Sequence, residues 1–194
     1  MNEPDPKLIK QCLRQDRRAQ ERLYKLCFGV LIGICGRYYR NQDEAVAAMN
    51  LGFLKVLKNL DRKSPDVPFK AWISRIMINT IIDEYRTTRT YRERILSVDF
   101  TEPHEEPVRT QLNDAEKQLD AEDAARLLLQ LPPTTRQVFN LFAIDGYSHA
   151  EVSSMMGISV GTSKWHVASA RKQLLAWIKR HKPYLIPSPA ANES

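Results

Sequence analysis

Residues 146–171 read GYSHAEVSSMMGISVGTSKWHVASAR, and this stretch decides the fold of the C-terminal part of the chain. Ser148 and Glu151 have the Ser-x-x-Glu spacing of a capping box, in which each residue satisfies a backbone donor at the start of a helix. Gly157 can take the left-handed conformation that ends such a helix, and Ser159 can cap the next one. The stretch therefore predicts two short helices around a tight turn.

Apolar residues recur at helical spacing through this stretch, and we expect them to pack the two helices together. They are Val152, Met155 or Met156, Val160, Val167, Ala170 and Leu174. The second helix keeps a largely outward set made of Lys164, Trp165, His166, Ser169 and Lys172. This is the layout of a helix-turn-helix, whose second helix enters the DNA major groove. Two amphipathic helices joined by a glycine turn and binding nothing would give the same pattern.

Composition favours an all-helical protein with ordinary globular cores. Hydrophobic residues make up 43% of the 194-residue chain, which argues against wholesale disorder. The chain has only seven glycines and lacks alternating runs of β-branched residues, which argues against β-sheets.

Charge is distributed in three blocks. Residues 1–95 hold 19 Lys and Arg against 11 Asp and Glu, residues 96–125 hold 2 against 9, and residues 126–194 hold 8 against 3. The net charges of the blocks are therefore +8, −7 and +5. Two basic blocks separated by an acidic strip suit a polyanion such as nucleic acid, although basic side chains also serve simply to solubilise helix faces.

The cysteines and the N-terminus indicate a cytoplasmic protein. Three cysteines without a CxxC motif do not suggest a disulfide framework. The first six residues, MNEPDP, are acidic and rich in proline, unlike a signal peptide. The apolar run at residues 26–35 is about half of the roughly 20 residues needed to span a bilayer, so we expect a buried helix and no membrane insertion.

Helical patterns occupy most of the first basic block. We expect helices over residues 6–14, from a cap at Asp16 to about Tyr39, over 43–60 and over 68–90, with a proline-bearing loop at 61–68. One stripe of the third helix comprises Ala47, Leu51, Leu54 and Leu57 or Val56. The fourth helix has a predicted core stripe of Phe69, Trp72, Ile73, Ile76, Met77, Thr80 and Ile81. Arg75, Asn79 and Arg86 share another face, which suits phosphate and base contacts.

The predicted architecture is all-α, with two small helical domains joined by a flexible acidic linker, the second domain being a helix-turn-helix. We expect the first domain over residues 1–95, the linker over 96–120, the second domain over 121–182 and a disordered tail over 183–194. In the second domain, Pro133 is expected to begin a helix that closes near Gly146.

We expect neither enzymatic activity nor a metal or other cofactor, and no catalytic residue is predicted. The four histidines are scattered without Cys or acidic partners at metal-ligand spacing. The sequence contains no phosphate-binding glycine-rich loop and no nucleophile motif. His149 is expected to have a structural role.

Two motif blocks resemble the extracytoplasmic-function (ECF) class of bacterial RNA polymerase sigma factors, within the sigma-70 superfamily. The first block is GFLKVLKNL at residues 52–60 and FKAWISRI at 69–76, with Asn79, Asp83 and Arg86, and is similar to region two of that family. The second is LPP at residues 131–133, RQVF at 136–139, GYSH at 146–149, GISVGTSK at 157–164 and Ala170-Arg171, similar to region four.

The resemblance implies a role for each block. Region two would dock on the β′ clamp helices of core polymerase through Asn50, Leu51, Phe53, Leu54 and Leu57. It would also capture the melted minus-ten element of promoter DNA, with Asn79 on a flipped base and Arg62, Lys63, Arg75, Arg86 and Arg89 beside it. Region four would contact the β flap and read the minus-thirty-five element through Thr162, Ser163, Lys164, Trp165, His166, Ser169, Arg171 and Lys172. The resemblance also implies an anti-sigma factor, often membrane-embedded in this family.

The chain departs from the family pattern before Phe53. The family has acidic residues around the position of Asn50, whereas residues 47–51 read AAMNL here. Our hypothesis is that docking depends more than usual on apolar contact. Trp165 has two interpretations, a contact with a thymine methyl or sugar and packing against a neighbouring helix.

The resemblance leaves two other function classes open, which are a stand-alone helix-turn-helix regulator and a scaffold that binds only protein partners. The segment 69–86 with its preceding loop favours the sigma factor, because a simple regulator does not need it.

Overall fold

The computed structural model describes residues 3–96 and 121–181, and it describes their side chains except at 89–96 and 121–125. Within these ranges all regular structure is helical, which confirms the all-α prediction. The chain divides into two compact units, residues 1–97 and 98–194. The predicted linker, beyond residue 96, and the predicted tail lie outside the described residues, as does the side chain of Arg89.

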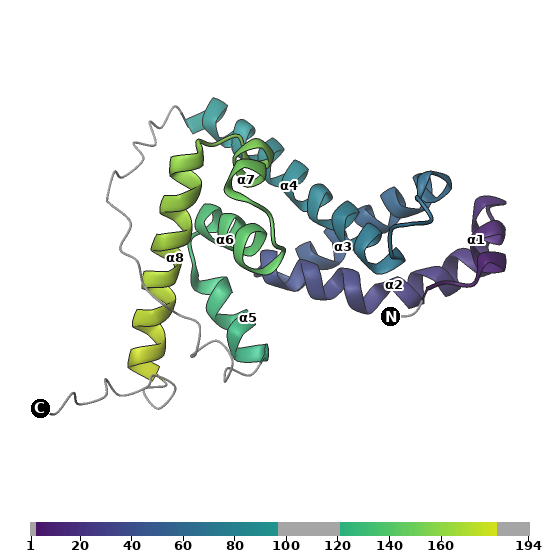
Figure 1. The fold of residues 1–194 in the computed structure, drawn as a ribbon, viewed down its shortest axis with the longest axis horizontal. Coiled ribbons are helices and arrows are strands. Elements are labelled where there is room, and N and C mark those ends of the chain that lie inside the picture. Colours follow the sequence, from purple (N-terminus) through teal and green to yellow (C-terminus); the bar gives the residue numbers. More distant parts are fainter. Residues whose placement is uncertain (1–2, 97–120, 182–194) are drawn as a thin grey trace, which may run out of the picture. The chain divides into compact units, whose positions relative to one another are not determined.

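Over residues 3–96, the first unit contains four α-helices and a short 3-10 turn. The helices are α1 (Pro6–Leu13), α2 (Arg17–Tyr38), α3 (Gln42–Lys58) and α4 (Phe69–Leu96), and the turn is η1 (Leu60–Arg62). Helices α2, α3 and α4 pack against one another, and α1 lies on α2 (Figure 1). Helix α4 extends six residues beyond the predicted end at residue 90.

Local side chains define where several of these helices begin. Asp16 accepts a hydrogen bond from the backbone N–H of Ala19 at 2.9 Å, which confirms the predicted cap of α2. Asn41 caps α3 in the same way through the N–H of Asp43. The first N–H of α4, at Phe69, instead donates to Glu3 at 2.6 Å. The N-terminal segment therefore reaches the start of the helix that carries Asn79.

The core of the first unit differs from the predicted stripe on α3. Its buried residues are Ala45, Ala48, Met49, Gly52, Phe53 and Val56. Ala47, Leu51 and Leu54 are exposed on another side, and Leu57 is half-buried. A side chain on Gly52 of α3 would place a Cβ 2.5 Å from the Sδ of buried Met77 on α4. The two helices therefore approach each other closely at Gly52, because glycine has no side chain.

Two further predictions about burial in this unit are only partly correct. In the 26–35 run, Cys27, Leu31, Ile34 and Cys35 are buried, whereas Phe28 is exposed. On α4, most of the predicted core stripe is buried, but Trp72 and Ile76 are only half-buried.

The second unit is built around the long helix α8 (Val160–His181). Helices α5 (Ala121–Gln130), α6 (Pro133–Phe139) and α7 (His149–Met156) all contact it (Figure 1). The helix predicted from Pro133 to near Gly146 is present: α6 continues directly into a π turn, η3 (Asn140–Ile144), which ends two residues before Gly146. Gly146 follows with a φ of 80°, in the left-handed region that glycine adopts without strain.

The predicted helix-turn-helix is present as α7 and α8. Both hydrogen bonds of the capping box join Ser148 and Glu151, and Gly157 has the left-handed conformation, with φ 66° and ψ 40°. The hydroxyl of Ser159 accepts from the N–H of Thr162 at 2.9 Å. Of the apolar set, Val152, Met156, Val167, Ala170 and Leu174 are buried as predicted. Val160, the first residue of α8, is 41% exposed, contrary to the prediction.

Candidate nucleic-acid interface

A hollow of about 350 Å³ lies beside Asn79 in the first unit. It is lined from α3, the 59–62 turn and α4, by Lys55, Asn59, Arg62, Trp72, Ile76, Asn79, Thr80 and Asp83. The Nζ of Lys55 lies 3.2 Å from Oδ2 of Asp83. Trp72, predicted to be a core residue, is only half-buried and lines this hollow, and its ring lies 5.7 Å from that of buried Phe69. An aromatic face beside an exposed amide and cationic groups is the chemistry that receives an unstacked nucleobase.

The basic residues predicted around Asn79 occupy different places. Arg62 lines the hollow and is exposed. Arg75 and Arg86 are exposed on α4, four residues before and seven residues after Asn79, so all three share one side of the helix. Lys63 is half-buried and donates to the carbonyl of Ser64.

Only some of the predicted polymerase-binding residues lie at the protein surface. Leu51 is 44% and Leu54 54% exposed, whereas Phe53 is 7% exposed. The ring of Phe53 packs edge-on against Tyr24, with centroids 5.1 Å apart. Phe53 is therefore removed from the predicted contact set, because it belongs to the core between α2 and α3.

Tyr24 joins this exposed patch to α2. Its hydroxyl donates to Oδ1 of Asn50 at 3.1 Å, and its ring lies 5.9 Å from that of Phe28. Phe28, 40% exposed, was missed by the sequence patterns, although its four-residue spacing from Tyr24 is a signal that could have found it. We call Phe28, Leu51 and Leu54 the apolar face; its large exposed side chains are typical of a protein-binding surface.

Helix α8 presents most of the predicted duplex-reading residues. Lys164 and Lys172 are exposed, and Thr162, Trp165, Ser169 and Arg171 are half-buried. The rings of Trp165 and His166 pack at a steep angle with centroids 4.9 Å apart, so packing within α8 covers part of the indole. The Nδ1 of His166 lies 3.0 Å from the hydroxyl of Thr135 on α6. His166, a predicted DNA contact, is therefore also hydrogen-bonded to the core of the unit.

The structure contradicts the prediction that Ser163 contacts DNA. Its side chain is fully buried, and its hydroxyl lies 2.9 Å from Nδ1 of His149. His149 stacks on Phe142, with ring centroids 4.0 Å apart, so its predicted structural role is confirmed. Burial lowers the pKa of His149, and the cations Lys164 and Arg171 lower it further.

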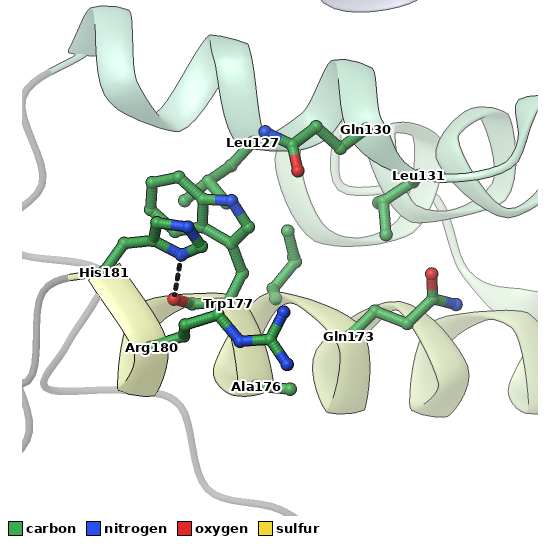
Figure 2. Close-up of a pocket in the computed structure, with 9 residues that line it drawn as sticks. Leu127, Gln130, Leu131, Gln173, Ala176, Trp177, Arg180 and His181 are labelled. Atoms are coloured by element: carbon green, nitrogen blue, oxygen red, sulfur yellow. Dashed lines mark hydrogen bonds between the residues drawn. The ribbon is translucent and has the colours of Figure 1, made fainter.

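A second hollow, of about 310 Å³, lies between α5 and the C-terminal half of α8 (Figure 2). Leu127, Leu131 and Leu174 supply apolar lining, and the His181 ring stacks on Trp177 at 4.3 Å. Its lining on α8 begins at Gln173, which follows Lys172 and donates to the hydroxyl of Ser169 at 3.1 Å, so the hollow adjoins the C-terminal end of the predicted duplex-reading set.

The described residues contain no group of three or more His, Cys, Asp or Glu side chains able to hold a metal ion. Cys12, Cys27 and Cys35 are buried and unbonded to one another. Across residues 3–96 and 121–181, none of the helices combines the length and apolar character needed to cross a membrane.

Both units match models of one protein family. The model of sigma-70 region 2 matches residues 23–91, and that of sigma-70, region 4 matches residues 121–174. RNA polymerase sigma factor CnrH of Cupriavidus metallidurans is 31% identical over 142 residues, which cover 70% of this chain and 69% of CnrH. The chain belongs to the sigma-70 family of RNA polymerase sigma factors.

Relatives that bear the name ECF RNA polymerase sigma factor place this sigma factor in the ECF class. ECF RNA polymerase sigma factor SigE of Mycolicibacterium smegmatis is 27% identical over 167 residues, which cover 85% of this chain and 60% of SigE. A solved structure of the sigma factor RpoE with the anti-sigma factor NepR from Bartonella quintana is 20% identical. It covers 84% of this chain and 98% of RpoE, with a TM-score of 0.49.

The family matches contain the site residues of both units. Region 2 of this sigma factor includes the apolar face and the hollow at Asn79, and region 4 includes α7 and the first two-thirds of α8. A stand-alone helix-turn-helix regulator is disfavoured, because it would not need the region 2 unit.

Proposed function

We propose that this chain binds core RNA polymerase and directs it to promoters, where it recognises two DNA elements and opens the duplex between them. The observation that carries the proposal is the hollow at Asn79, with an indole, an amide and basic groups, in a chain that also holds a helix-turn-helix. In this proposal the chain acts in the cytoplasm and catalyses no reaction itself.

Capture of the minus-ten element is assigned to the hollow in region 2. A base flipped out of the non-template strand would present its Watson–Crick edge to the amide of Asn79 and stack near Trp72. Arg62, Arg75 and Arg86 would hold the adjacent phosphates, which position the strand without reading its sequence. Lys63 and Arg89 complete the proposed basic set.

Reading of the minus-thirty-five element is assigned to α8. Lys164 and Lys172 are exposed cations of this helix, and Arg171, which precedes Lys172, is half-buried. Thr162, Trp165, His166 and Ser169 complete the proposed set, in which hydroxyl, ring and cationic groups provide base-edge and phosphate contacts in the major groove. Ser163 has no part in it because it is buried.

Docking on the β′ clamp helices is assigned to the apolar face, with Asn50 and the half-buried Leu57 at its side. Ala47 and Leu51, which stand where the family has acidic residues, are both exposed, so an acidic side chain there would reach the surface. We infer that apolar contact replaces part of the usual charge pairing. If an Ala47→Glu variant, which adds the acidic group without removing a side chain of the apolar face, binds core polymerase no better than the wild type, this inference is contradicted.

Three further partners are part of the proposal. Region 4 would contact the β flap, and tethering both DNA-reading units to one polymerase would raise their joint affinity through effective concentration. The solved structure of RpoE of Bartonella quintana is a complex with the anti-sigma factor NepR, and control by an anti-sigma factor is proposed for this chain. Promoter DNA is the third of these partners.

The deciding experiment combines the purified chain with bacterial core RNA polymerase and genomic DNA of the source organism, then maps the 5′ ends of the transcripts. We expect a stable complex and start sites preceded by two shared sequence elements. Duplex binding without a polymerase complex would favour the stand-alone regulator, and a polymerase complex without specific start sites would favour the scaffold.

A further inference from the structure

His149 is the first residue of α7, but its side chain contacts two other elements. One face of the imidazole stacks on Phe142 of η3, with the rings 13° from parallel. Its Nδ1 lies 2.9 Å from the hydroxyl of Ser163 on α8. The ring therefore bridges the turn before α7 and the start of the helix assigned to the DNA duplex.

Ser163 is well placed to set the orientation of α8. It is fully buried and lies between Thr162 and Lys164, two of the proposed duplex contacts. Because neighbouring residues of a helix point about 100° apart, a rotation of α8 at Ser163 would displace both side chains from the groove. A buried hydrogen bond is directional, so it restricts this rotation more than apolar packing of the same area would.

The charged groups that act on His149 are both on α8. They are Lys164 and Arg171, and the ring contact from η3 is the uncharged Phe142. Protonation of the imidazole would place a third positive charge in a partly buried site beside the two cations that the proposed function assigns to DNA. The neutral ring is thus the form compatible with the observed packing.

We infer that His149 is a positioning residue for promoter recognition: it holds Ser163, and through Ser163 it fixes the rotation of the duplex-reading helix. This inference rests on the proposed function of α8. It assigns the choice of minus-thirty-five sequence partly to a side chain that does not itself touch DNA.

The test uses the full chain bound to core polymerase. The wild-type complex first selects duplexes from a random-sequence library, and binding is then compared between an enriched duplex and a scrambled duplex of the same composition. Three variants are compared with the wild type. Ser163→Ala removes the hydroxyl, His149→Asn keeps a hydrogen-bonding group near the position of Nδ1, and Ser154→Ala is a matched change at an exposed site on α7.

We expect Ser163→Ala to lower the preference for the enriched duplex about fivefold, the effect of losing one buried hydrogen bond, with little change for the scrambled duplex. We expect His149→Asn to retain most of the preference and Ser154→Ala all of it. Unchanged preference in Ser163→Ala, or an equal loss on both duplexes, would overturn the inference.

A pH series provides a second readout, because the preference is a ratio of two affinities and a loss of folded protein would lower both affinities equally. The wild-type preference should weaken as the pH falls below about 6.5, the ordinary pKa of histidine, and His149→Asn should lack this component. Matching profiles of the two proteins would overturn the inference even if Ser163→Ala failed to fold. Failure of the wild type to enrich any sequence would instead overturn the proposed function.

Discussion

The ammonium of Lys55 lies 3.2 Å from the carboxylate of Asp83 and joins α3 to α4 at the rim of the hollow that contains Asn79. The pair is partly exposed, so its contribution to folding is small. Its position matters more, because it keeps a positive charge beside the amide at the point where a nucleic acid would enter. The lining of the hollow therefore combines the neutral amide of Asn79, the aromatic Trp72 and the ammonium of Lys55, which is paired with the carboxylate of Asp83.

Asn79→Ala should reduce promoter opening about tenfold, because the amide would no longer bond the flipped base. Permanganate reactivity of thymines in the minus-ten element measures the opening. Asn59→Ala is a matched control in the same hollow, since the Asn59 amide already donates to the carbonyl of Lys55. An equal loss in both variants would mean that the hollow does not read a base through Asn79.

Leu54→Asp should weaken binding to core polymerase at least about tenfold by placing a charge in the apolar face. The thermal midpoint should hardly change, because the side chain is exposed. Leu13→Asp makes the same change at an exposed leucine on α1, outside this face, and should leave polymerase affinity intact. Titration of labelled variants with core polymerase gives the affinities, and equal weakening by both substitutions would contradict the assignment.

Phe53→Ala should act differently from Leu54→Asp although the two residues are adjacent. Removing the buried ring should lower the free energy of unfolding by about 3 kcal/mol, through lost burial and the cavity left against Tyr24. Urea unfolding followed by circular dichroism measures this loss. A polymerase-binding defect in Phe53→Ala with unchanged stability would return Phe53 to the contact set.

Ser148→Ala should destabilise region 4 by about 1 kcal/mol, because it removes the side-chain acceptor for the N–H of Glu151. Ser154→Ala, an exposed serine-to-alanine change within the same helix, should be neutral or slightly stabilising. Hydrogen exchange of the α7 amides resolves the two effects. Comparable protection in both variants would show that the capping box does not determine where α7 begins.

The thiols of Cys27 and Cys35 should be unreactive toward iodoacetamide in the folded protein at pH 8. Burial raises the pKa of each to about 12, so the reactive thiolate is scarce, and access is blocked as well. All three cysteines should be alkylated after unfolding in guanidinium chloride. Mass spectrometry counts the labels, and rapid labelling of Cys27 or Cys35 in the native state would contradict their burial.

Region 4 should lose stability as the pH falls through about 6.5. The folded-state pKa of His149 is lowered, so below the ordinary histidine value the unfolded state binds more protons than the folded state. His149→Gln should show a smaller loss between pH 7 and pH 5. Chemical unfolding of the two proteins at both pH values provides the comparison, and an identical loss would assign the dependence to other groups.

Local patterns predicted the helix boundaries well where a cap involves residues close in sequence. Asp16, Ser148, Gly157 and Ser159 act within four residues of themselves, so the physical cause of each boundary was contained in a short peptide. The start of α4 was different, because its first N–H is satisfied by Glu3, 66 residues away. No window of sequence around Phe69 contains that partner.

The sequence by itself determined the helical class, the helix-turn-helix and the place of Asn79 on a basic face, because periodicity and capping are short-range properties. Only the tertiary structure decided which apolar side chains were covered. Helix α3 has two apolar stripes, and the one beside Gly52 is buried because it approaches Met77 of α4. Burial of Ser163 likewise depends on His149 across the turn. Which face of a helix is covered follows from neighbours that fold against it, so spacing alone could not separate core from contact surface.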